Sequence, residues 1–290
     1  MHVSVLVPSS LVREATDKRE ATRKLGYVAR AATVFRADRL IVFDDPEGER
    51  GTRWDGGFVE TVLRYAATAP YLRTEVWDER DELEYAGVLP PLRASPQTGS
   101  GSTDSGSLRQ GIVTRVGPEG RVRVNCGLQH PISLVVPPEM AVDEGERVTV
   151  RISSRRPVRA RLVDEAPPGY RVERADLPDV LGREDAGFRV ATSRHGVALT
   201  PSLLGRLAGR IADDGLTVAF GAPDRGLPEM ETVGTDRESV TEYAAEVDAN
   251  RDIPGRFDCW LNAIPNQGSE TVRTEEAMFA ALATLTLTET

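Results

Sequence analysis

Three short segments in the last third of the sequence combine residue types that bring the backbone close to a ligand. They are Thr192–Gly196, Phe220–Gly226 and Asn262–Gly268. All three contain glycine, and the second and third also contain proline. Glycine permits close approach to a ligand, and proline fixes the direction of loop N–H and C=O groups. One such segment alone is an ordinary turn. All three follow strand-like apolar runs, and open α/β sheets bind ligands beyond the carboxyl ends of their strands, so together they indicate a binding site.

Other kinds of site lack their motifs in this sequence. It contains no GxGxxG and no GxxxxGK[ST], so the phosphate cradles of dinucleotide and P-loop proteins are missing. It also contains no GxSxG nucleophile elbow. The histidines His2, His130 and His195 show no metal-ligand spacing, and we expect no metal site. His195 falls in the first segment, where a solvent-facing loop histidine is the ordinary interpretation.

The elements that must position the three segments follow from apolar periodicity. Strands are predicted at residues 3–7, 40–43, 188–192, 216–220 and 257–261, and helices at 17–35, 58–69, 201–212 and 274–285. Strands that alternate with helices are typical of an open α/β sheet. Thr274 is expected to cap the last helix, with Glu275 and Glu276 in its first turn, where carboxylates favour the helix dipole.

The middle of the chain has a different texture. Residues 93–107 are a linker rich in Gly and Ser, and residues 108–164 alternate apolar and polar positions between Gly, Pro and Asp turns. Strands are predicted at 111–116, 121–125, 132–136 and 147–152, which suits a small, OB-like β-barrel. We therefore predict one α/β domain, residues 1–92 and 165–290, interrupted by an inserted all-β domain.

Charge is distributed unevenly along the chain. The net charge is −9, and Lys18 and Lys24 are the only lysines among 36 basic residues. Acid surplus with few lysines is typical of the cytoplasmic proteins of halophiles. A high-GC bacterial genome would explain the arginines but leaves the acids unexplained.

The insert is locally basic, with ten arginines in residues 105–164 and five of them in residues 151–161. Arginine recognises phosphate and stacks on bases, so the insert is expected to bind RNA. The alternative is that these arginines pair with local carboxylates.

The cellular compartment is predicted from membrane-spanning, signal-peptide and cysteine patterns. No apolar stretch is long enough to span a bilayer, and the N-terminal segment does not have the composition of a signal peptide. Cys126 and Cys259 lie far apart and form no CxxC pattern. We expect reduced thiols in a cytoplasmic protein with no membrane partner.

The third segment and its continuation, residues 261–277 (LNAIPNQGSETVRTEEA), closely resemble the C-terminal motif of a known family. This is the archaeal and eukaryotic family of SPOUT-class RNA uridine N3-methyltransferases. The second segment is similar to the family's GxPxxGL signature as Gly221–Leu227, and the stretches 24–35 and 40–44 also resemble it. The likeness covers both halves of the split domain. The linker at 98–107 looks longer than the family requires.

The resemblance implies a fold, a cofactor and a partner. The fold is a SPOUT-type α/β sheet with a trefoil knot and an OB-like insert. The protein works as a homodimer in which the second subunit completes the site. The cofactor is S-adenosyl-L-methionine, and the substrate is RNA, with ribosomal RNA and uridine N3 favoured. The residues that it implies around the cofactor are Thr192, Ser193, Phe220, Gly221, Ala222, Gly226, Asn262, Ile264, Pro265, Gln267, Gly268 and Thr271.

Methylation of uracil N3 requires a proton to leave, which calls for a base and a group that stabilises the anion. The sequence candidates are Arg225 and Arg273 for the anion or the RNA, and Glu270 for the base. A salt bridge at a dimer interface is an equal alternative for Arg273. Two rival functions remain open from the sequence: a noncatalytic RNA-binding or ribosome-assembly factor that keeps the fold, and an α/β enzyme acting on a small metabolite. The second rival leaves the basic insert unexplained.

Overall fold

The computed structural model describes residues 1–51, 53–90, 94, 107–118, 120–230 and 257–287. The chain divides into two compact units, each built from separate stretches of sequence. The first contains Met1–Ala66, Asp81–Pro90 and Arg171–Thr290, and the second contains Ala67–Arg80 and Pro91–Tyr170. Each unit has a β-sheet of its own.

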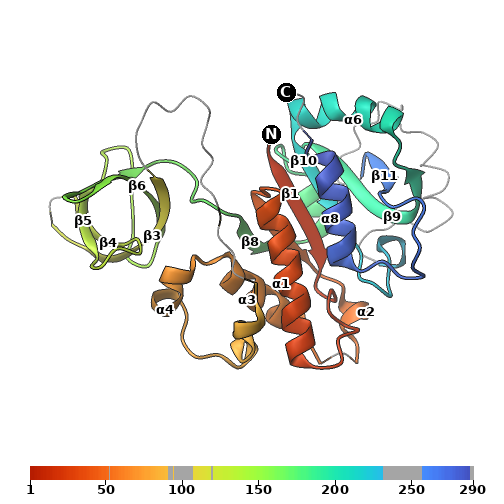
Figure 1. Ribbon diagram of the computed structural model, residues 1–290, viewed down its shortest axis with the longest axis horizontal. Helices are drawn as coiled ribbons and strands as arrows, with labels where there is room; N and C mark the ends of the chain where they lie inside the picture. The colour runs from red at the N-terminus through yellow and green to blue at the C-terminus, as the bar shows by residue number, and fades with distance from the viewer. Residues whose placement is uncertain (52, 91–93, 95–106, 119, 231–256, 288–290) are drawn as a thin grey trace. The chain divides into compact units, whose positions relative to one another are not determined.

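A parallel sheet of six strands forms the first unit (Figure 1). In spatial order its strands are β11 (Cys259–Asn262), β9 (Phe188–Ala198), β10 (Leu216–Ala219), β1 (Val3–Pro8), β2 (Arg39–Phe43) and β8 (Arg171–Arg174). Every residue of β1 and β10 is buried, as expected for central strands of a parallel sheet covered on both faces. The predicted α/β class is confirmed, and the edge strand β8 is an addition to the prediction.

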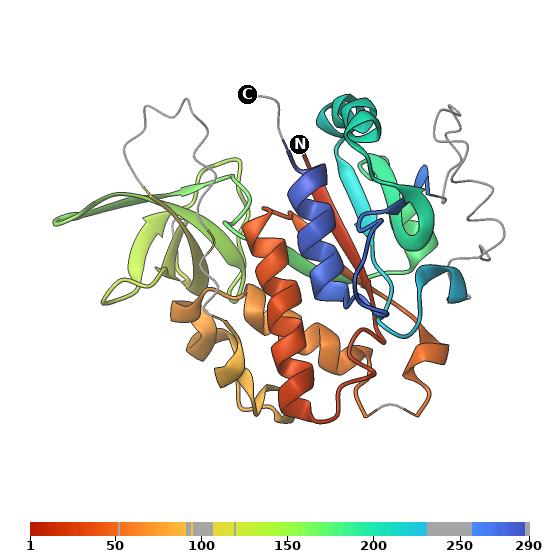
Figure 2. The ribbon, with the colours of Figure 1, turned by 45° about the vertical axis from the view of Figure 1, so that its right-hand side comes forward.

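The helices of the first unit are α1 (Lys18–Val34), α2 (Pro46–Glu49), α3 (Gly56–Ala67), α5 (Leu177–Leu181), α6 (Pro201–Asp214) and α8 (Thr274–Leu285). Short 3-10 turns lie at η2 (Asp81–Leu83), η3 (Ala86–Val88) and η4 (Leu227–Glu229). Helices α1 and α8 lie side by side along β1 (Figures 1 and 2). The four helices predicted from periodicity are confirmed within two residues at each end.

Helix starts follow the capping residues, with one correction. Asp17 accepts a hydrogen bond from the Glu20 N–H at 2.7 Å and so caps α1. The prediction that Thr274 caps α8 was wrong by one residue. Arg273 holds the cap position, and its N–H donates to Glu276 Oε2 at 2.9 Å. Thr274 is the first residue of the helix, so its hydroxyl is free to bond outside it.

The second unit is a nearly closed antiparallel sheet. In spatial order its strands are β5 (Ile132–Val135), β4 (Arg121–Asn125), β3 (Ser107–Val116), β6 (Arg147–Arg155) and β7 (Val158–Val163). The outer strands β5 and β7 also contact each other. The four predicted strands are confirmed, whereas β7 was missed because arginine occupies its exposed positions. The interior is apolar, with Val124 and Val150 fully buried.

The segment Ala67–Arg80 packs with this antiparallel sheet. It contains the 3-10 turn η1 (Pro70–Leu72) and the short helix α4 (Arg73–Val76). The Tyr71 hydroxyl donates to the Gln110 carbonyl at 3.0 Å, and the Arg109 guanidinium lies 5.4 Å from the centre of the Tyr71 ring. Asn125 Nδ2 donates to Glu75 Oε1 at 3.3 Å. The second unit thus combines two stretches of sequence.

A buried ion pair fixes the edge of the parallel sheet. Arg189 on β9 donates from Nε and Nη2 to the two carboxylate oxygens of Asp258, at 2.9 and 2.8 Å. Their side chains are only 7% and 8% exposed. Asp258 also accepts the Arg189 N–H at 2.8 Å. Bidentate geometry with further hydrogen bonds is the condition under which a buried pair is stable. This pair sets where β11 begins beside β9.

Candidate functional site

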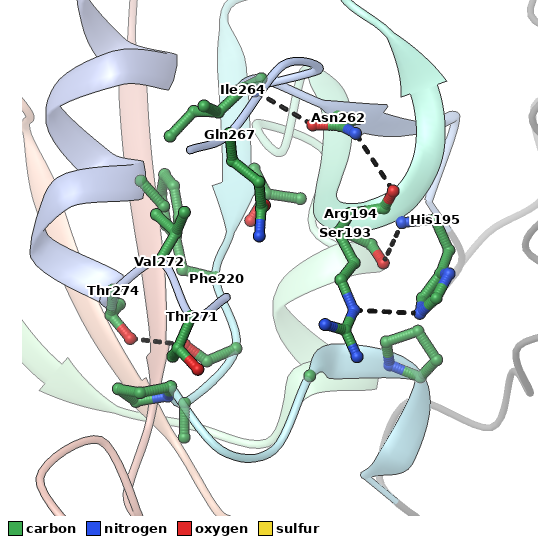
Figure 3. Close-up of a pocket in the computed structure, with 18 of the residues that line it drawn as sticks. Ser193, Arg194, His195, Phe220, Asn262, Ile264, Gln267, Thr271, Val272 and Thr274 are labelled. Atoms are coloured by element: carbon green, nitrogen blue, oxygen red, sulfur yellow. Dashed lines mark hydrogen bonds between the residues drawn. The ribbon is translucent and has the colours of Figure 1, made fainter. Parts of the chain in front are cut away.

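The three Gly- and Pro-containing segments meet at the carboxyl ends of β9, β10 and β11 around a cavity of about 340 Å³. A cavity of this size is at the lower end of the range for small-molecule sites. Figure 3 shows Ser193 and Arg194 on one side, facing Gln267 and Thr271 across the cavity. The start of α8 closes the site through Thr274 and Ala277.

The first segment forms a bulge inside β9, which corrects the prediction of a loop after a shorter strand. Ala191 pairs with Trp260 and Val197 pairs with Leu261, so residues 192–196 have no counterpart on β11. Bulges of this kind redirect side chains, and they are frequent beside active sites. A side chain on Gly196 would approach the backbone of residues 260 and 261 to 2.7 Å, so only glycine fits there.

Two side chains hold the bulge in place. Thr192 Oγ1 donates to the Ala219 carbonyl at 2.8 Å, which ties the bulge to β10. Asn262 Nδ2 donates to the Arg194 carbonyl at 3.1 Å, and Asn262 Oδ1 accepts the Ile264 N–H at 3.0 Å. One amide therefore connects the first segment to the third (Figure 3).

The second segment is a compact turn after β10. Ala222 and Arg225 form an isolated antiparallel bridge, and Ala222 and Leu227 are buried. A side chain on Gly221 would come within 2.8 Å of the Leu227 nitrogen. The Thr274 hydroxyl donates to the Gly221 carbonyl at 2.7 Å, which links this turn to the start of α8.

The third segment supports itself through side-chain to backbone hydrogen bonds. Gln267 Nε2 donates to the carbonyls of Ser269 and Glu270, at 2.9 and 3.2 Å. The Ser269 hydroxyl donates to the Thr271 carbonyl at 2.8 Å. A polar loop with its own hydrogen bonds keeps a defined shape without an apolar core.

Ten of the twelve residues predicted around a cofactor line the cavity; Pro265 and Gly268 do not. The ten that line it are Thr192, Ser193, Phe220, Gly221, Ala222, Gly226, Asn262, Ile264, Gln267 and Thr271. Their segments are far apart in sequence, and the strand order 11-9-10 brings them together.

Of the three predicted catalytic residues, only Glu270 lines the cavity, where it is exposed. Arg225 belongs to the second segment, but its guanidinium contacts Asp45 and Glu47, at 3.3 and 3.0 Å. Arg273 is the exposed cap residue of α8. Neither arginine is among the residues that line the cavity.

Several lining residues were not assigned to the site from the sequence. The ionisable ones are Arg194, His195, Asp224 and Glu229. His195, which the sequence suggests is a solvent-facing loop histidine, is half-buried and lines the cavity. The signal that could have identified it is its place between Ser193 and Gly196, in a segment already predicted to approach a ligand.

Burial shifts the ionisation of two groups close to the site. Glu275, in the first turn of α8, is 8% exposed, and burial raises the pKa of its carboxyl. Cys259 on β11 is buried, and this burial raises the pKa of its thiol to about 12. Cys126 in the second unit is likewise buried with a raised pKa, and both cysteines are free thiols.

Two further features concern metal ions and membranes. Among the residues that the structure describes, no cluster of three or more His, Cys, Asp or Glu side chains is arranged to hold a metal ion. Within the same part of the chain, no helix has the length and apolar character to cross a membrane.

Similar proteins occur in archaea and animals. The chain is 69% identical to an uncharacterised protein of Halobacterium salinarum over 99% of both chains. It is 64% identical to one of Haloarcula marismortui over the full length of both. It is 28% identical to the human 28S rRNA (uridine-N(3))-methyltransferase, over 98% of this chain and 77% of the human one.

The model of one protein family matches residues 2–285, which include both units and all three segments of the cavity. The chain therefore belongs to the family described as "Putative RNA methyltransferase".

Proposed function

We propose that this protein is an S-adenosylmethionine-dependent methyltransferase that modifies a base of ribosomal RNA, with uridine N3 as the acceptor. The cavity at the ends of β9, β10 and β11 carries the proposal, because its three segments belong to a chain of an RNA methyltransferase family. The animal relatives are named as uridine-N3 methyltransferases of 28S rRNA, and this supports the choice of atom and RNA class.

The residues of the cavity fit an adenine nucleoside joined to an amino acid. Ile264 gives apolar contact surface for a flat ring, the buried Phe220 and Leu261 support the wall behind it, and Asn262 and Gln267 supply amides. The Gly221 carbonyl and the Asn262 amide already have partners inside the protein, so the shape exists before any ligand binds. We propose that the twelve residues predicted from the sequence form this cofactor site, with Pro265 and Gly268 acting through the shape of their loop.

Bound S-adenosylmethionine supplies a methyl group on a positively charged sulfur. The protein's part is to hold the acceptor nitrogen in line with that methyl group and to exclude water. Alignment of this kind provides much of the rate enhancement. The self-supported third segment and the bulge held by Asn262 are suited to this task because both are fixed by internal hydrogen bonds.

The second unit is proposed as the RNA-binding part, an OB-like barrel. Its strand order, with β3 next to both β4 and β6 and with β5 against β7, supports this proposal of a five-stranded barrel. Arg115 and Arg123 lie directly opposite each other on β3 and β4, and both are exposed. Like charges in such a pair destabilise a sheet unless an anion binds them, and RNA phosphate is the proposed anion.

Some arginines of this unit have structural partners instead. Arg151 contacts Glu165 at 2.6 Å, and Arg109 donates to the carbonyls of Cys126 and Gly127. Local pairing therefore accounts for these two, and the RNA proposal rests on exposed arginines such as Arg115, Arg121 and Arg123. We also propose a trefoil knot in the first unit and a homodimer, as the family resemblance implies.

Two measurements test the function. Titration calorimetry with S-adenosylmethionine is expected to show binding. The N262A variant should bind more weakly because it releases the bulge, and N125A in the second unit is the matched control.

The second measurement is mass spectrometry of rRNA from a strain without the protein. This rRNA is expected to lack 3-methyluridine at one position. Loss of a 2′-O-methyl nucleoside would refute the uridine N3 assignment. No binding at millimolar ligand would refute the enzyme and favour a noncatalytic RNA-binding factor.

A further inference from the structure

The cavity contains one histidine among its ionisable groups. The described groups that line it are Arg194 and His195 from β9, Asp224 and Glu229 from the second segment and the turn after it, and Glu270 from the loop that continues the third. Arg194, Asp224 and Glu270 are exposed, whereas His195 and Glu229 are half-buried. A group that takes a proton from a bound base must reach into the site, which favours the half-buried pair.

The ring of His195 accepts a hydrogen bond from the exposed side chain of Arg194. Arg194 Nε donates to His195 Nε2 at 3.3 Å (Figure 3). A guanidinium has no acceptor, so Nε2 must carry its lone pair and the neutral ring must carry its proton on Nδ1. The His195 N–H donates to Ser193 Oγ at 3.2 Å, which holds the backbone beside the ring. Nε2 is therefore the proton-accepting atom of this histidine.

The bulge in β9 gives Arg194 and His195 their direction. Residues 192–196 leave the β9–β11 ladder together, because Gly196 fits against the backbone of β11 and the Arg194 carbonyl accepts Asn262 Nδ2. A regular strand would continue the pairing and would point alternate side chains to opposite faces. The bulge instead places two neighbouring side chains, both of which line the cavity. The bulge leaves residues 192–196 without ladder partners on β11. Because bulges of this kind are frequent beside active sites, it indicates a functional role.

We propose that His195 is the general base that takes the proton from the acceptor nitrogen of the RNA base, and that Arg194 stabilises the resulting negative charge. This inference rests on the proposed function. In the step, the N3–H bond breaks and its proton moves to His195 Nε2. The N3 electron pair forms the bond to the methyl carbon, and the electrons of the broken carbon–sulfur bond stay on sulfur. Arg194 gives up its bond to Nε2 and donates to a carbonyl oxygen of the base.

Histidine suits this step better than the carboxylates of the cavity. A general base is most effective when it titrates near the working pH. An ordinary histidine titrates at roughly 6.5, while ordinary carboxylates titrate near about 4. Glu229 is the one half-buried carboxylate among the described residues of the cavity, and the experiment includes it.

The first test reads the ring directly and needs no catalysis. The chain has three histidines, so ¹⁵N signals of labelled imidazoles can be assigned with the H195Q variant. His195 is expected to show an unprotonated Nε2 at neutral pH and to change its tautomer mixture in R194Q. A protonated Nε2 in the neutral wild-type ring, or no response to R194Q, would overturn the assignment.

The second test is single-turnover methyl transfer to rRNA as a function of pH. H195Q is expected to lose about 10²- to 10⁴-fold in rate and the acidic limb of the profile. Its affinity for S-adenosylmethionine should stay within about twofold, and added imidazole should restore part of the rate. H2Q, at the opposite end of β1, is the control and should behave as wild type. A normal rate and profile in H195Q, or loss of the limb in E229Q or E270Q instead, overturns the proposal. No transfer by the wild type at all would overturn the proposed function itself.

Discussion

Arg225 in the second segment reaches the buried carboxylate of Asp45 beyond β2, with Nε 3.3 Å from Oδ1. Their side chains are 16% and 2% exposed. Ser10 donates its hydroxyl to Asp45 Oδ2 at 2.6 Å, and Arg225 Nη2 also contacts Glu47 at 3.0 Å. The pair joins a cavity segment to the turn after β2, 180 residues earlier in the chain. Arg225 is thus placed to hold the segment in position rather than to touch a substrate.

The R225Q variant is expected to be less stable by about 3–5 kcal/mol, because it leaves the Asp45 carboxylate buried without its counter-charge. Affinity for S-adenosylmethionine should also fall as the second segment loosens. Urea unfolding and titration calorimetry measure the two effects. D45N with R225Q should recover part of the stability. R19Q, an exposed arginine on α1, is the control and should stay within about 0.5 kcal/mol of wild type.

Substitution of Thr274 tests the hydrogen bond that links α8 to the second segment. T274V keeps the shape of the side chain but leaves the Gly221 carbonyl without its donor. The expected loss of stability is about 1–3 kcal/mol, with weaker cofactor binding. T284V is matched on the same helix, since the Thr284 hydroxyl bonds carbonyls of α8 itself. Equal effects of the two substitutions would contradict a special role for the bond to Gly221.

Substitution by alanine at two glycines, one on β9 and one on α6, should change the stability of the protein in opposite directions. G196A forces a methyl group against the backbone of β11, so we expect a loss of about 1–3 kcal/mol and disruption of the bulge. G205A adds a methyl group on exposed α6 with no atom within 4 Å and should stabilise the protein by about 0.5–1 kcal/mol. Thermal unfolding of both variants measures these changes. A neutral G196A would show that the bulge is not tightly held.

The stability of the folded protein is expected to depend on pH through Glu275. Burial raises the pKa of its carboxyl in the folded state, so the folded protein holds this proton more tightly than the unfolded chain. Stability from this group is therefore complete below the ordinary carboxyl pKa and falls as pH rises through the raised value. E275Q should be more stable than wild type at about pH 7, and the difference should vanish near about pH 4. Urea unfolding across this range measures it.

The neighbouring residue supplies the control for that series. Glu276 is exposed, and its carboxylate accepts the Arg273 N–H at the start of α8. E276Q removes a charge that favours the helix dipole, so it should lower stability at neutral pH by roughly 0.3–1 kcal/mol. Opposite signs for two adjacent glutamates are the expected result. The same sign for both would show that burial does not control Glu275.

The thiols should be unreactive in the folded protein. Burial raises the pKa of both Cys126 and Cys259, the latter to about 12, so the thiolate that reacts with iodoacetamide is scarce at mildly alkaline pH. Mass spectrometry after alkylation should find both free in native protein and both modified in urea. Rapid modification of Cys259 in native protein would contradict the burial of β11.

The sequence predicts the helices and strands that depend on local periodicity. It does not predict features whose conformation is set by residues far away in the chain. Helix α1 and strand β1 carry their own apolar patterns. The bulge at 192–196 exists because β11 pairs on both sides of it, and the apolar periodicity of the segment does not show this distant pairing. The ion pair of Arg189 and Asp258 joins residues 69 positions apart. For the same reason the cavity's glycines were found and the direction of His195 was not.

The chain enters the antiparallel unit twice, because Ala67–Arg80 packs there together with Pro91–Tyr170. Removal of residues 108–164 alone would take away the Gln110 carbonyl from Tyr71 and Arg147 from Thr68, whose hydroxyl it contacts at 2.8 Å. The two stretches therefore depend on each other for these contacts. A deletion variant intended to test RNA binding has to remove both Ala67–Arg80 and the stretch that ends at Tyr170.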